Sequence, residues 1–124
     1  MAGEKIMIVD DDIEFLSQLK EIIQLSGYYP IVTYDSSSVL SFARKMEPDL
    51  ILLDLRMDNV DGYEVAACLQ HFPETAKIPI IAMTGFYDAE KYNQHIKNCN
   101  MKACLEKPFN PLDVIGQIEN ILSN

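Results

Sequence analysis

Basic residues are scarce in this sequence, with ten lysines and arginines against nineteen aspartates and glutamates and a net charge of −9. Such a deficit disfavours nonspecific binding to nucleic acid or to an anionic membrane, and it favours cations or basic partner surfaces. No apolar segment approaches the roughly 20 residues of a membrane span, and Ile6–Val9 is too short and too soon followed by acids for a signal peptide. We therefore expect no direct nucleic-acid binding, no membrane insertion and a cytoplasmic location.

Cysteine is also scarce. Cys68, Cys99 and Cys104 are odd in number and show neither a CxxC pair nor a His-rich zinc spacing, which favours reduced, structural thiols over a disulfide framework. Internal repeats, low-complexity tracts and a plausible linker are missing as well. With 124 residues, 48% of them hydrophobic, the chain can bury its own core, so we expect one domain over residues 1–124 with a core of about 4–122.

Five short apolar segments alternate with helical patterns. The central one, Asp49–Asp54, is an unbroken Leu/Ile run closed by a carboxylate, which is typical of a parallel strand buried on both faces. The other predicted strands are Lys5–Val9, Pro30–Tyr34, Ile80–Thr84 and Lys102–Leu105. This alternation predicts a doubly wound α/β fold, in which right-handed crossovers place helices on both faces of the sheet.

Helical spacing and capping residues mark the intervening segments. In the first helix Leu16, Leu19 and Ile23 face inward, and Gly27 is expected as its left-handed C-terminal cap. In the second helix the residues expected to face inward are Val39, Phe42, Ala43 and Met46. Later helices are predicted over residues 63–71, over residues 88–98, and from the N-cap Asn110 and Pro111 onward.

Side chains with reactive or charge-binding character follow four of the five predicted strands: Asp10 and Asp11, Asp54, Thr84 and Lys107. Because the carboxyl ends of parallel strands lie at one edge of a sheet, these side chains are expected to converge. Carboxylates that close repel each other, and a hard divalent cation such as Mg²⁺ would neutralise them with oxygen ligands. Without the metal, one carboxyl should have a raised pKa or pair with Lys107.

Such a site is suited to accepting a phosphoryl group. With magnesium neutralising the charge, Asp54 can attack a phosphoryl group as a carboxylate nucleophile. Thr84 and Lys107 are placed to contact the transferred oxygens. The product would be an aspartyl phosphate.

Four sequence pieces, in order along the chain, carry a resemblance that extends from Lys5 to Leu122. They are Ile8-Val9-Asp10-Asp11, then Leu53-Asp54 followed by Met57 and Asp61-Gly62, then Met83-Thr84-Gly85, and Leu105-Glu106-Lys107-Pro108-Phe109. The chain resembles a response-regulator receiver domain of two-component signalling, with a CheY-like fold. The resemblance implies a flavodoxin-like five-stranded sheet of order 2-1-3-4-5 and a cis Lys107–Pro108 bond.

The resemblance also implies function. It implies phosphotransfer to Asp54 from the phosphohistidine of a histidine kinase or a phosphotransfer protein, with Thr84 and Lys107 on the phosphoryl group. Magnesium would be held by Asp10, Asp11, Asp54 and the backbone carbonyl of Arg56. The chain would be a non-enzymatic phosphorelay module that assists its own phosphorylation and dephosphorylation.

The resemblance also suggests a downstream protein or effector domain as a partner. Weak homodimerisation is a further alternative. Docking is expected on the face made by the fourth helix, the fifth strand and the fifth helix. No effector is expected after the last helix at Leu122.

Two residues depart from the pattern of the family. Asp58 stands where a proline usually follows the methionine of the loop, and Cys104 stands where the family carries a switch aromatic. Our hypothesis is that Phe86 or Tyr87 carries part of the switching signal instead. Gly85 is expected to leave the site open.

Other functions stay open beside this one. A receiver-like interaction module that is no longer phosphorylated would explain the two departures. A haloacid-dehalogenase-like phosphatase is suggested by Asp10-x-Asp12, although Glu14 replaces the threonine expected there and Asp12 is more often a helix N-cap. A flavin mononucleotide site is disfavoured, because no Gly/Ser/Thr-rich phosphate loop follows the first strand. His71 and His95 are assigned to the surface.

Overall fold

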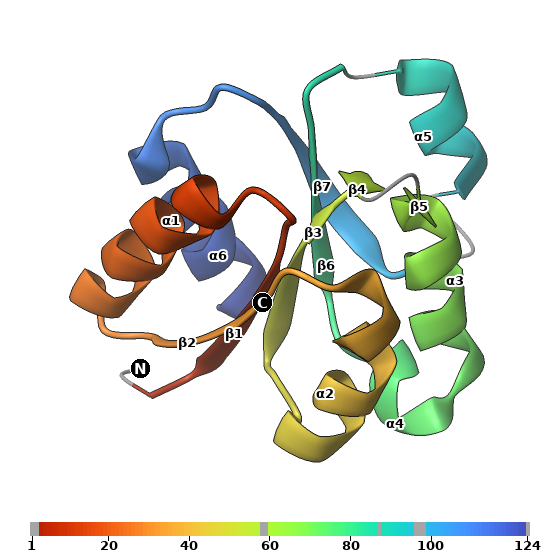
Figure 1. Ribbon diagram of the computed structural model, residues 1–124, viewed down its shortest axis with the longest axis horizontal. Coiled ribbons are helices and arrows are strands. Elements are labelled where there is room, and N and C mark those ends of the chain that lie inside the picture. Colours follow the sequence, from red (N-terminus) through yellow and green to blue (C-terminus); the bar gives the residue numbers. More distant parts are fainter. Residues whose placement is uncertain (1–2, 58–59, 87, 96–98, 124) are drawn as a thin grey trace.

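The computed structural model describes residues 3–57, 60–86, 88–95 and 99–123. A five-stranded parallel sheet runs through its centre in the order β2-β1-β3-β6-β7 (Figure 1). The strands are β1 (Lys5–Val9), β2 (Tyr29–Thr33), β3 (Leu50–Asp54), β6 (Ile80–Thr84) and β7 (Met101–Glu106). Numbered among themselves, these strands have the order 2-1-3-4-5, so the predicted doubly wound, flavodoxin-like fold is confirmed.

Helices cover both faces of the sheet. In Figure 1, α1 and α6 lie on one face, and α2, α3, α4 and α5 lie on the other. Their bounds are α1 (Ile13–Leu25), the 3₁₀ turn η1 (Ser36–Ser38), α2 (Val39–Met46), α3 (Gly62–His71), α4 (Pro73–Ala76), α5 (Ala89–His95) and α6 (Pro111–Leu122). None of these helices is both long and apolar enough to cross a bilayer in the described part of the chain.

The strand residues alternate between two hydrophobic clusters. Ile6 and Ile8 pack with the inner sides of α1 and α6, whereas Met7 and Val9 pack with residues of α2 and α3. All four side chains are fully buried. This two-sided burial explains why the central strands β1, β3 and β6 are continuous apolar runs rather than alternating ones.

The predicted helix ends are largely confirmed. Asp12 is the N-cap of α1 and accepts a hydrogen bond from the Phe15 amide, and Asn110 caps α6 through the Leu112 amide. Gly27 has a φ of +94° just beyond the end of α1, a conformation in which glycine meets no Cβ penalty.

Three features differ from the sequence-based expectations. The segment expected as a simple loop contains a two-stranded antiparallel hairpin, β4 (Arg56–Met57) and β5 (Val60–Asp61), and the short helix α4 was not predicted. On α2 the inward orientation expected for Val39 and Ala43 is confirmed, whereas the one expected for Phe42 is wrong, since 39% of Phe42 is exposed. Asp58, Tyr87 and the end of the helix predicted over residues 88–98 lie outside the described residues.

All three cysteines are free thiols, as expected. Cys99 is buried and Cys104 is half-buried, which suits a packing role. Cys68 is exposed on α3, where packing does not account for it.

Candidate functional site

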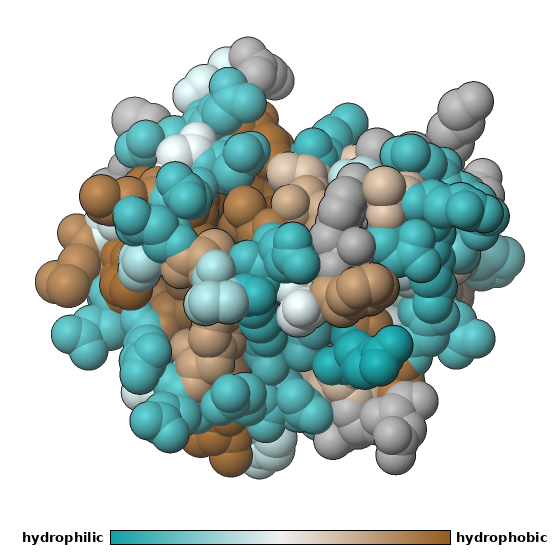
Figure 2. Space-filling view, turned by 90° about the horizontal axis from the view of Figure 1, so that it is seen from above, coloured by the Kyte–Doolittle hydropathy of each residue, from teal (hydrophilic) through white to brown (hydrophobic). Residues whose placement is uncertain are grey.

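The predicted site residues meet at the carboxyl edge of the sheet. Strand β3 lies between β1 and β6, with Val9 beside Leu53 and Asp54 beside Met83. The residues that end or follow these strands therefore become neighbours. In Figure 2, which looks onto this edge from above Figure 1, the surface is mostly hydrophilic, with more of the hydrophobic residues on the side of α1 and α6.

Three carboxylates form the centre of the site. One oxygen each of Asp10, Asp11 and Asp54 lies within 4.8 Å of the other two. Asp10 is fully buried, Asp54 is 6% exposed and Asp11 is exposed. Asp10 also accepts a hydrogen bond from the Asp12 amide at 3.0 Å, which fixes its orientation at the start of α1.

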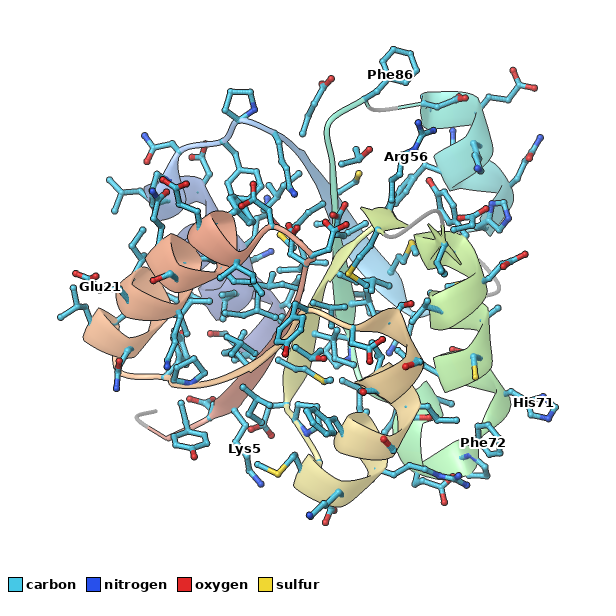
Figure 3. The ribbon with its side chains drawn as sticks, in the orientation of Figure 1. Lys5, Glu21, Arg56, His71, Phe72 and Phe86 are labelled. Atoms are coloured by element: carbon cyan, nitrogen blue, oxygen red, sulfur yellow. The ribbon has the colours of Figure 1, made fainter. Side chains whose placement is uncertain are left out.

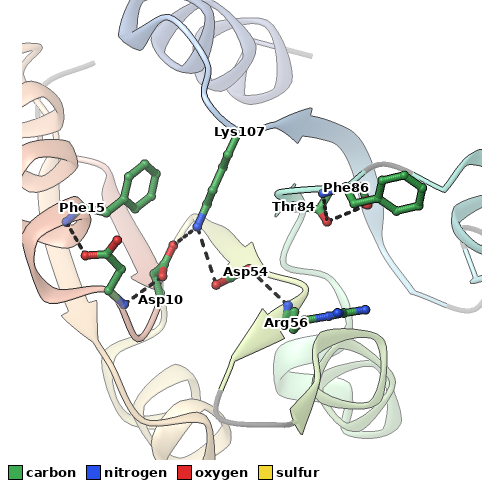
Figure 4. Close-up of polar contacts among 8 residues, drawn as sticks. Asp10, Phe15, Asp54, Arg56, Thr84, Phe86 and Lys107 are labelled. Carbon is green, nitrogen blue, oxygen red and sulfur yellow. Dashed lines mark hydrogen bonds and ion pairs between the residues drawn. The ribbon is translucent and has the colours of Figure 1, made fainter.

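Lys107 reaches into this cluster from the segment after β7 (Figure 4). Its Nζ atom lies 2.5 Å from Asp10 Oδ2 and 3.6 Å from Asp54 Oδ2. The Lys107 amide donates to the Thr84 carbonyl at 2.7 Å, which ties the lysine to the end of β6. The Lys107–Pro108 bond is cis, as the resemblance implied. The predicted pairing of a site carboxylate with Lys107 is therefore present.

The electrostatics of Asp54 follow from this packing. Burial, and after it the nearby Asp10 charge, raise the pKa of its carboxyl, which lies at about 6 when all of its neighbours act together. The Arg56 amide, which donates to Asp54 Oδ1 at 3.1 Å, and the Lys107 charge both lower that pKa, but they do not outweigh burial. Asp54 therefore combines a raised pKa with an ion pair to Lys107.

The donor set fits a hard divalent cation. Three carboxylates face one ammonium in the described part of this site, so negative charge is in excess. Carboxylate oxygens are the ligands that Mg²⁺ takes in proteins, usually together with several waters. The role of the Arg56 carbonyl as a further ligand stays a prediction.

Thr84 ends β6 with its side chain almost fully buried. Its hydroxyl donates to the Phe86 carbonyl at 2.9 Å and accepts from the Phe86 amide at 3.2 Å. The Phe86 side chain itself is 78% exposed and projects from the upper edge in Figure 3. A Cβ built on Gly85 meets nothing within 4 Å, so the site is open there, as expected.

The first residue of α3, Gly62, lies close to the backbone that follows β3. The Gly62 amide donates to the Leu55 carbonyl at 2.8 Å, and a Cβ built on Gly62 would lie 2.5 Å from Leu55 Cα and 2.7 Å from the Asp54 carbonyl oxygen. Only glycine permits this approach. Asp61 is the N-cap of α3, because its carboxylate accepts a hydrogen bond from the Tyr63 amide at 2.9 Å.

Sequence reasoning missed two contacts around the site. The Phe15 ring lies against the Lys107 ammonium, with 4.3 Å between Nζ and the ring centre. His95 is half-buried rather than on the surface, because its ring stacks on Tyr63 with centroids 4.3 Å apart. His71 is exposed, as expected. Neither contact has a signal in the sequence beyond helical spacing.

The chain is similar to known proteins over nearly its whole length. It matches the response regulator receiver domain family over residues 6–119. It is 31% identical over 121 residues to the polar-differentiation response regulator DivK of Brucella anthropi, with 98% of each chain covered.

Two solved structures are similar as well. The chemotaxis protein CheY4 of Vibrio cholerae is 27% identical, with a TM-score of 0.88 over 97% of this chain and 99% of that one. The receiver domain of the sensor histidine kinase PA1611 of Pseudomonas aeruginosa is 22% identical, with a TM-score of 0.86 over 99% of this chain and 100% of that one. That structure has a magnesium ion coordinated in its active site cleft. The fold, the sequence match and the relatives agree, and the chain belongs to the response regulator receiver domains of two-component signalling.

Proposed function

We propose that this chain accepts a phosphoryl group on Asp54 from the phosphohistidine of a histidine kinase or a phosphotransfer protein. The observation that carries the proposal is one buried carboxylate, Asp54, that lies 3.6 Å from the Lys107 ammonium and clusters with Asp10 and Asp11. An Asp54 oxygen would attack the phosphorus, the phosphorus–nitrogen bond would break, and the imidazole would leave with its electron pair. Thr84 and Lys107 would then contact the transferred oxygens.

Magnesium is the proposed cofactor, held by Asp10, Asp11, Asp54 and the Arg56 carbonyl. When bound, it supplies positive charge that stabilises the negative charge of the transferred group. The excess of carboxylates over ammonium at this edge supports the assignment, as does the magnesium ion in the similar receiver domain of PA1611. Asp10 would give up its close contact with Lys107, and the lysine would become available to the phosphoryl group.

The proposed role is signalling rather than turnover of a substrate. Phosphorylation would change the face made by α5, β7 and α6, which would be presented to a downstream protein or effector domain. A weak homodimer would form through the same face. We propose a cytoplasmic location and one domain over residues 1–124, with no direct binding to nucleic acid or membrane. The net charge of −9 supports that last point.

Phosphorylation is tested with acetyl phosphate as the donor and intact-mass measurement as the readout. In the presence of Mg²⁺ the wild-type chain should gain the mass of one phosphoryl group, and neither Asp54→Asn nor the wild type in excess EDTA should gain it. A wild type that gains nothing, or an Asp54→Asn variant that gains as much, would refute the proposal.

A receiver-like module that is not phosphorylated is the second candidate. One observation favours it: the groups needed for the chemistry already have partners, since the Thr84 hydroxyl donates to Phe86 and Lys107 is bound to Asp10. The mass experiment separates the two functions directly. A phosphatase that uses Asp10 as its nucleophile fits less well, because Asp10 is fully buried; it would require turnover of a soluble phosphate ester that Asp10→Asn abolishes and Asp54→Asn does not.

A further inference from the structure

The Lys107 ammonium contacts an aromatic ring as well as two carboxylates. Its Nζ atom lies 4.3 Å from the centre of the Phe15 ring, which projects from the first turn of α1 (Figure 4). That ring is supported in turn by an edge-on contact with Phe109, with 5.7 Å between the ring centroids. Both rings are half-buried, so the pair is anchored in the protein rather than free in solvent.

The ring contact differs in kind from the contacts with the carboxylates. A lysine ammonium has three N–H donors and no acceptor, and here it has an acceptor on Asp10 at 2.5 Å and a longer ion pair with Asp54 at 3.6 Å. The face of an aromatic ring attracts a cation through its quadrupole and needs no directed N–H bond to do so. The ring can therefore hold the ammonium in place while its N–H groups change partners.

We propose that Phe15 is a positioning residue for the phosphotransfer proposed above, and the inference rests on that function. Phe15 holds the Lys107 ammonium over the carboxylates before the phosphoryl group arrives, and it keeps it there when the bond to Asp10 is exchanged for a phosphoryl oxygen. It touches neither the donor nor Asp54 and acts through Lys107 alone. Lysine has a long, flexible stem, so such preorganisation lowers the barrier to reaching the productive geometry.

The expected effect is modest and specific. A cation–π contact at a partly desolvated site corresponds to a factor of roughly 2 to 30 in a rate or equilibrium constant. Phe15→Leu, which keeps the apolar volume but removes the ring, should slow phosphorylation by that factor. Phe15→Tyr restores a ring and should restore the rate. Phe109→Leu is the matched control, since it also removes a half-buried ring but keeps the Phe15 ring that contacts Lys107.

The experiment uses the full chain and has two readouts. The first is the rate of mass gain with acetyl phosphate and Mg²⁺ for the wild type, Phe15→Leu, Phe15→Tyr and Phe109→Leu, after thermal melts have checked that each variant folds. The second is the ¹H–¹³C signal of the Lys107 ε-methylene group, assigned by its absence in Lys107→Arg. Ring current from Phe15 should shift this signal in the wild type, and the shift should disappear in Phe15→Leu and persist in Phe15→Tyr.

The outcomes are distinguishable. Slower phosphorylation and a lost Lys107 shift in Phe15→Leu alone, both rescued by Phe15→Tyr, would support the positioning role. A Phe15→Leu variant as fast as the wild type, an equal loss in Phe15→Leu and Phe109→Leu, or a tyrosine that fails to rescue would overturn it while leaving phosphorylation of Asp54 intact. A wild type that gains no mass would overturn the proposed function, and this role with it.

Discussion

Replacing Asp54 with asparagine should stabilise the protein at neutral pH when divalent cations are removed. Burial first, and the Asp10 charge second, raise the pKa of the Asp54 carboxyl from 3.8 to about 6 in the folded state. Between these pH values the folded chain keeps a proton that the unfolded chain has released, so the free energy of unfolding falls as the pH rises. The contribution of the protonated carboxyl is complete below about pH 3.8 and is lost above about pH 6.

The size of the effect follows from the shift. It amounts to about 2 pH units, and each unit corresponds to about 1.4 kcal/mol, so ionising Asp54 destabilises the folded state by about 3 kcal/mol. Asparagine has the shape of the neutral acid, and its side-chain oxygen can still accept the Arg56 amide, which lies 3.1 Å from Asp54 Oδ1. Asp54→Asn should therefore raise the free energy of unfolding by up to about 3 kcal/mol at pH 8 and change it little at pH 4.

Urea unfolding followed by circular dichroism at pH 4 and pH 8, in EDTA, measures this difference, provided the m-values of the two proteins agree. Asp113→Asn, at an exposed aspartate in the first turn of α6, is the control and should show no gain at pH 8. An Asp54→Asn variant that is no more stable than the wild type at pH 8 would refute this prediction. So would a gain in the free energy of unfolding that does not shrink towards pH 4.

Three further predictions rest on local geometry. Gly62→Ala should destabilise the protein by roughly 1–3 kcal/mol, because the added Cβ would lie 2.5 Å from the Leu55 Cα atom. Gly85→Ala is the control, since a Cβ there meets nothing within 4 Å. Equal melting temperatures for the two variants would contradict the prediction. Gly116→Ala in the exposed interior of α6 should raise the free energy of unfolding by about 0.5–1 kcal/mol through helix propensity, and a loss in urea titration would disprove it. The exposed Cys68 thiol should be alkylated quickly in the folded protein. Burial raises the pKa of the Cys104 thiol to about 11, so alkylation of Cys104 should be slow. Peptide mass mapping that finds Cys104 labelled first would refute this.

The fold could be predicted because its signals are local and repeated. The three central strands, β1, β3 and β6, are apolar runs of the right length, and a parallel sheet buried on both faces leaves few other assignments for such runs. The carboxyl edge then places Asp10, Asp54, Thr84 and Lys107 together without any knowledge of side-chain directions. The carboxylate cluster follows from topology alone, given that β1 and β3 are neighbours.

The missed features depend on packing between distant segments or on very short elements. The hairpin of β4 and β5 has two residues in each strand, too few for a periodicity to be visible. Phe42 follows the helical pattern of its neighbours, but α2 has only eight residues and buries one narrow side. The ring of Phe15 reaches Lys107 only because the first turn of α1 lies against the segment after β7. No spacing in the sequence encodes that distance.

The hydrogen bonds of Thr84 bear on how a signal could leave the site. A threonine hydroxyl has one hydrogen, and here it is donated to the Phe86 carbonyl. If Thr84 donates to a phosphoryl oxygen, that bond must be given up, so the segment carrying the exposed Phe86 is the first part of the chain required to adjust. The half-buried Cys104 thiol offers no ring that could rotate in response. The prediction that Phe86 carries part of the signal thus gains a physical reason, and unchanged phenylalanine resonances on adding a phosphoryl mimic would contradict it.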